Sequence, residues 1–139
     1  MAVAFNKFRQ FVEDVMKGVH NFTSDATSTI TVALTSVAPV NTNSIRSELT
    51  EIAYTNFSSR IITGVTAEQV AGVATLTGNT LVLTASATTP SFRYVALYND
   101  DPTSPADPLI GWYDYGADIV LQAGETLTID LSAGILTVQ

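Results

Sequence analysis

The sequence contains no cysteine and a single histidine, His20, among its 139 residues. Without cysteine there can be no disulfide, no thiolate nucleophile and no zinc site built on cysteine. A Ser-His-Asp arrangement would have to use His20, and no nucleophile elbow or metal-spaced partner accompanies that residue. We therefore predict a capping or packing role for His20. We expect no enzyme activity and no cofactor.

Charged residues are also scarce, at 14% of the chain against about 25% in ordinary soluble domains. Only six residues are Lys or Arg, none of them follows Arg93, and the net charge is −7. Nucleic-acid binding depends on clustered cations that displace counterions from phosphates, so this class of function is excluded. The acidic C-terminal third indicates either steering of a basic partner or simple solubility.

No run of apolar residues is long enough to span a bilayer. The first eleven residues mix Lys7 and Arg9 with phenylalanines, a pattern unlike that of a signal peptide. We expect a soluble protein that is made and used inside a cell, with no membrane partner.

Apolar residues recur at three- and four-residue steps between residues 5 and 19, which predicts a short amphipathic helix. Gly18 is a plausible terminator, and Thr23, Ser24 and Asp25 have the chemistry of a loop. The predicted buried stripe consists of Phe5, Phe8, Val12, Val15 and Val19.

The period then changes to two, which is typical of strands. This pattern predicts strands at residues 30–35 and 92–98. We expect the second strand to lie in the interior of a sheet, because both its faces are largely apolar. Gly78-Asn79 predicts a tight hairpin between residues 69–77 and 80–87. Further short strands are predicted between residues 109 and 138. We predict one mainly β domain over residues 1–139, with a helical segment at 1–20 and a jelly-roll-like β-sandwich at 28–139.

The loop at residues 99–108 is rich in aspartate and proline. Asp100, Asp101 and Asp107 are weak candidates for calcium ligands, because calcium accepts carboxylates from flexible loops. Their spacing matches no known calcium loop, and turns alone explain the same residues. We therefore expect no metal here.

Three aromatic residues lie within Gly111–Gly116 and could form a sugar-binding platform or an interface hot spot. On a strand, Trp112 and Asp114 face one way and Tyr113 and Tyr115 the other. We expect the first face near solvent or a partner, and the tyrosines in the core. The candidate interface residues are Phe8, Val12, Trp112, Tyr113 and Tyr115.

Several segments together resemble the small structural proteins of tailed bacteriophages, most of all the capsid decoration, or cement, proteins. They are FRQFVEDVMKGVHNF from Phe8, ITVALTS from Ile30, FRYVALYND from Phe92, PLIGWYDYG from Pro108 and AGETLTIDL from Ala123. These segments have the sequence patterns of strands and turns and contain no catalytic motif. The resemblance implies a jelly-roll-like body that sits on the outer shell of a head and fastens neighbouring capsid subunits.

We accordingly expect a structural virion protein that is made in the cytoplasm of a host bacterium and then binds the outside of a phage capsid. Its expected partners are the major capsid protein or another virion protein, and further copies of itself in a dimer or trimer. The alternative is a tail or head-fibre component that binds a carbohydrate or receptor through Trp112, Tyr113 and Tyr115.

Overall fold

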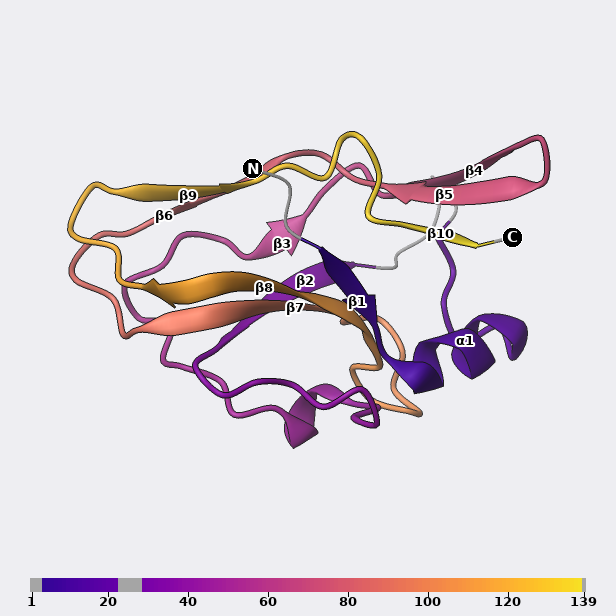
Figure 1. Ribbon diagram of the computed structural model, residues 1–139, viewed down its shortest axis with the longest axis horizontal. Coiled ribbons are helices and arrows are strands. Elements are labelled where there is room, and N and C mark those ends of the chain that lie inside the picture. Colours follow the sequence, from indigo (N-terminus) through magenta and orange to yellow (C-terminus); the bar gives the residue numbers. More distant parts are fainter. Residues whose placement is uncertain (1–3, 23–28, 139) are drawn as a thin grey trace.

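A computed structural model describes residues 4–22 and 29–138 and is mainly β (Figure 1). The predicted loop residues Thr23, Ser24 and Asp25 lie outside these ranges. The helical elements are α1 (Arg9–Met16) and a 3₁₀ turn, η1 (Arg46–Glu48). The strands are β1 (Phe5–Lys7), β2 (Ile30–Thr35), β3 (Ile61–Ile62), β4 (Thr66–Val70), β5 (Val73–Thr77), β6 (Leu81–Thr84), β7 (Phe92–Asn99), β8 (Leu109–Ile119), β9 (Thr126–Ile129) and β10 (Leu136–Val138).

One layer is a five-stranded antiparallel sheet with strand order β1-β8-β7-β2-β3. All six residues of β2 are buried, and so are most residues of β7. The interior position predicted for β7 is confirmed, because it lies between β8 and β2. A register shift between Phe92 and Tyr94 interrupts the simple alternation of β7, so that Phe92 joins the same core as Val95 and Leu97.

The facing layer contains β4, β5 and β10 in one sheet and β6 paired with β9 in another. The hairpin predicted at Gly78-Asn79 is wrong, because β5 pairs with β10 whereas β6 pairs with β9. Gly78 donates its N–H to the Leu131 carbonyl, and Asn79 donates to that of Thr63. Gly78-Asn79 thus connects β5 to β6, which belong to two different sheets of the facing layer. A residue larger than glycine does not fit at position 78, because its Cβ would lie 2.8 Å from the Ile62 side chain.

The tight hairpin lies instead between β4 and β5, at Ala71-Gly72. Val70 pairs with Val73, and the two turn residues have φ values of 53° and 85°. Positive φ at both central positions is the requirement of a type I′ turn, whose twist matches that of the strands. Alanine is an unusual residue there because its Cβ is strained in the left-handed region.

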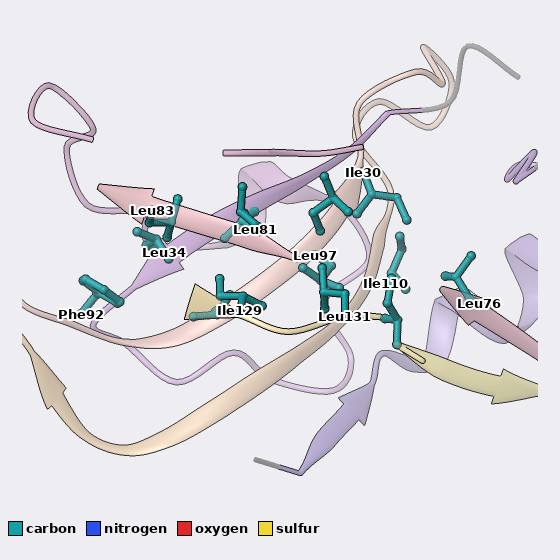
Figure 2. Packing of buried hydrophobic residues seen from close by; sticks show 14 of the residues in the cluster. Ile30, Leu34, Leu76, Leu81, Leu83, Phe92, Leu97, Ile110, Ile129 and Leu131 are labelled. Atoms are coloured by element: carbon teal, nitrogen blue, oxygen red, sulfur yellow. The ribbon is translucent and has the colours of Figure 1, made fainter. Parts of the chain in front are cut away.

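The main core lies between the two layers (Figure 2). Leu34, Phe92, Leu97 and Ile110 come from the five-stranded sheet, and their partners are Leu76, Leu81, Leu83 and Ile129 of the facing strands together with Leu131, which follows β9. Burial of such side chains contributes about 1.5–3 kcal/mol each to folding. The two layers are therefore held together by the apolar face of each.

A second, smaller core covers the outer face of the five-stranded sheet. Phe8, Ala33, Ala96, Tyr98 and Leu109 are buried in it, and Leu49 and Trp112 pack against it. The connection between β2 and β3 also completes the free edge of β2: the Leu34 N–H donates to the Tyr54 hydroxyl at 2.9 Å, and Ile52 N–H donates to the Leu34 carbonyl. Beyond β3, which pairs only with Ile30 and Thr31, this connection therefore supplies partners for the backbone of β2.

We predict that Ala71→Asn stabilises the protein by about 0.5–1 kcal/mol, because asparagine tolerates the left-handed conformation better than alanine does. Urea denaturation followed by circular dichroism measures the change. Ala67→Asn, at an exposed extended position of β4, is the matched control and should be neutral or destabilising. Equal destabilisation by both substitutions would contradict the turn assignment.

Candidate interaction surface

Helix α1 lies at one end of the two layers, directly after the edge strand β1 (Figure 1). It spans Arg9–Met16, and Phe5–Lys7 pairs with β8 instead of forming the first helical turn that the sequence suggested. The face of the helix that turns inward carries Phe11 and Asp14. None of the helices in residues 4–22 and 29–138 is long and apolar enough to cross a membrane.

The predicted apolar stripe therefore divides between core and surface. Of its members, Phe8 is 0% exposed, whereas Val12 and Val15 are 55% and 37% exposed. Outside the predicted stripe, Phe11 is 2% exposed and Met16 is 87% exposed. Phe8 as an interface residue needs correction, since its ring fills the outer core of its own chain and contacts Trp112 at 4.6 Å between ring centroids. Val12 is free to meet a partner.

A groove runs between α1 and the C-terminal strand β10, and we call it the helix groove. Its volume is about 430 Å³, and its walls are mainly apolar side chains. Val15 and Val138 are 37% and 42% exposed there. The groove is lined by Lys7, Phe11, Val12, Val15, Met16, Thr137 and Val138.

A second groove, of about 690 Å³, lies between β1 and the loop that follows β2, and we call it the Trp112 groove. Lys7 lines both grooves, so the two adjoin at β1. Gly111 allows β1 to approach, because a Cβ at this position would lie 2.3 Å from the Phe5 ring and 2.5 Å from the Asn6 carbonyl oxygen. The Trp112 groove is lined by Phe5, Asn6, Lys7, Ala38, Pro39, Val40, Asn41 and Trp112.

The three candidate aromatic residues of β8 do not share a face. Tyr113 and Tyr115 pack against the main core, as expected, and burial raises the pKa of Tyr113 to about 12. Trp112 lies on the opposite face beside Asp114, whose carboxylate accepts two hydrogen bonds from Arg93, at 2.8 and 3.1 Å. The prediction that all three rings form one sugar-binding platform is therefore wrong. Of the three, Trp112 lines the Trp112 groove.

The acidic loop between β7 and β8 is held by turn and ion-pair contacts. Asn99 accepts a hydrogen bond from the Asp101 N–H, and Asp107 lies 3.9 Å from Arg46. Burial, followed by the neighbouring Asp100 charge, raises the pKa of Asp107. Within residues 4–22 and 29–138, no group of three His, Asp or Glu side chains could hold a metal ion.

His20 packs under the helix, stacked on Phe22 and tilted against Phe11. Its Nδ1 accepts a hydrogen bond from the Asn99 side-chain amide at 3.1 Å. Burial lowers the pKa of His20 to about 4, although the charge of Asp14 opposes this shift. These contacts agree with the packing role predicted for His20.

Sequence reasoning missed Phe11, Met16 and Val138 as members of this surface. Phe11 and Met16 each lie one position from a residue of the predicted stripe, so the stripe did not include either of them. Val138 could not have been found, because its place beside α1 depends on the pairing of β10 with β5.

Comparison of the chain with family models, with curated proteins and with solved structures finds no match. The resemblance to phage decoration proteins therefore stays a prediction.

We predict that Phe8→Ala lowers the free energy of unfolding by about 3–5 kcal/mol, because it empties the centre of the outer core. Val12→Ser, four residues further on, should change it by less than about 1 kcal/mol, since Val12 is exposed. Guanidinium denaturation of both variants measures the contrast. Similar losses in the two would show that α1 buries the other face.

We also predict that stability falls as the pH drops from about 6.5 to about 4. The unfolded chain binds a proton at His20 in this range and the folded chain does not, so protonation favours unfolding. After allowance for partial exposure, the loss is on the order of 1–2 kcal/mol. The difference between the wild type and His20→Gln, measured by thermal unfolding across this pH range, isolates the effect. Parallel pH profiles would contradict it.

Proposed function

We propose that this chain is a structural virion protein, most like a capsid decoration protein, that binds its partners through the surface formed by α1, β1 and β10. The observation that carries the proposal is the cluster of exposed apolar side chains around the helix groove. Val12, Val15, Met16 and Val138 are each more than a third exposed, and all four line this one groove. Exposed contiguous apolar surface marks sites of protein association.

This surface is suited to binding in several copies at once. Burying a Val or Met side chain contributes about 1.5–3 kcal/mol at most, so one copy of a small patch binds weakly. A dimer or trimer that engages neighbouring subunits of a lattice gains affinity because the second contact is intramolecular. The major capsid protein on the outside of a phage head is the partner that fits this arrangement.

The jelly-roll-like description of the body belongs to the same proposal. The chain crosses between the two layers from β3 to β4, from β6 to β7 and from β8 to β9, as a sandwich with crossed connections requires. Two facing antiparallel layers give a rigid support for α1.

A tail or head-fibre component with a carbohydrate-binding site is the second candidate. The Trp112 groove supports it, because an aromatic ring beside the side-chain amides of Asn6 and Asn41 is the chemistry that binds sugars. Tyr113 and Tyr115 take no part in this version, since they pack inward.

We predict that the protein cosediments with expanded phage capsids in a fixed copy ratio. Val12→Asp with Met16→Asp should weaken that binding at least tenfold without changing the melting temperature, because both side chains are exposed. Val70→Asp is the control, since Val70 is 77% exposed on β4, outside both grooves. Absence of capsid binding by the wild type would refute the decoration role, and equal binding by all variants would refute the surface.

A further inference from the structure

Strand β1 is an edge of the five-stranded sheet. Phe8 donates its N–H to the Ile110 carbonyl of β8 at 3.2 Å, and backbone groups alternate in direction along a strand. The N–H and C=O groups of Phe5 and Lys7 therefore point away from β8. Such an edge is a template for a further strand.

The Trp112 groove follows this edge and provides the other elements of a docking site. Trp112 supplies aromatic surface, and Pro39 and Val40 form the opposite wall. The wall is fixed in place, because the Arg9 N–H donates to the Asn41 carbonyl at 3.0 Å. This open groove of about 690 Å³ lies beside a strand edge that pairs with no other strand of residues 4–22 and 29–138. Such a groove suits an extended segment of a few residues.

The charges beside the groove indicate what kind of segment it takes. Four of the six cations are engaged within the chain: Lys17 with Glu13, Arg46 with Glu51, Arg93 with Asp114, and Arg60 stacked on the Tyr54 ring.

The remaining cations, Lys7 and Arg9, form no ion pair with any residue in the described part of the chain, and both flank the β1 edge. A second copy paired through its own β1 would bring like charges together, which disfavours self-pairing. An acidic segment would be attracted.

We propose that β1 accepts an extended acidic segment of a partner protein as an added β-strand. The partner segment forms backbone hydrogen bonds with Phe5 and Lys7, its apolar side chains contact Trp112, and its carboxylates pair with Lys7 and Arg9. This inference goes beyond the proposed function, because it holds whether the partner belongs to a head, a tail or another assembly.

The test uses the fluorescence of Trp112, the only tryptophan of the chain. The probe is the acetylated and amidated peptide Glu-Val-Thr-Val-Glu-Val, titrated into the full-length protein to a few millimolar. Two further peptides serve as controls: one with lysine in place of both glutamates, and one with the acidic sequence and alternate backbone nitrogens methylated so that it cannot join a sheet. We expect saturable binding of the acidic peptide, at least tenfold tighter than that of either control.

Charge-reversed variants complete the test. Lys7→Glu with Arg9→Glu should reverse the preference between the acidic and the basic peptide, whereas Lys17→Glu should leave it unchanged. No saturable response to the acidic peptide, or equal binding of the N-methylated peptide, would overturn strand addition. A response to a mixture of bacterial-surface oligosaccharides but not to the acidic peptide would overturn it in favour of a glycan site. None of these results depends on capsid binding.

Discussion

The structure depends on one constraint: the central strands β2 and β7 are buried on both faces, so both faces need a cover. The facing layer covers one side, where Leu83 and Leu131 pack against Leu34 and Leu97. The other side is covered by separate pieces of chain, with Phe8 at its centre. Because Phe8 stands between β1 and α1, the need to cover the sheet also fixes where the helix lies.

This arrangement explains why the helix presents apolar side chains to solvent. Phe8 and Phe11 use the inward positions, together with the buried Asp14, so Val12 and Met16 have no remaining core to enter. On the opposite side of the sheet, β3 and the connection from β2 to β3 pair with β2, and Tyr54 and Ile52 satisfy the backbone of Leu34. The open edge and the exposed apolar face therefore gather at the N-terminal end, which is where both proposals place a partner.

The sequence pattern predicted the parts of this fold that depend on local alternation. β2 and β7 lie where a period of two placed them, and Trp112 and Tyr113 point to opposite faces as a strand requires. It failed where tertiary pairing overrode a local signal. Gly78-Asn79 has good hairpin chemistry, yet its flanking strands find different partners, and Ala71-Gly72 turns with a poorer residue because β4 and β5 align there.

The candidate surface was predictable only in part, for a related reason. A helical period identifies an amphipathic segment but does not say whether its first turn will be taken by a sheet. The pairing of Phe5 with Tyr113 decides this, and it moves Phe8 from a presumed interface into the core. The helix groove also needs Val138, about 120 residues away in the chain, which no local pattern connects to α1.

Hydrogen–deuterium exchange of the protein, free and bound to its assembly, tests the central claim that the N-terminal end is the docking end. Our account predicts slower exchange on binding in residues 4–16 and 136–138, with no change at the β4–β5 hairpin. Protection confined to the opposite end of the layers, around residues 116–125, with none in β1 or α1, would contradict it.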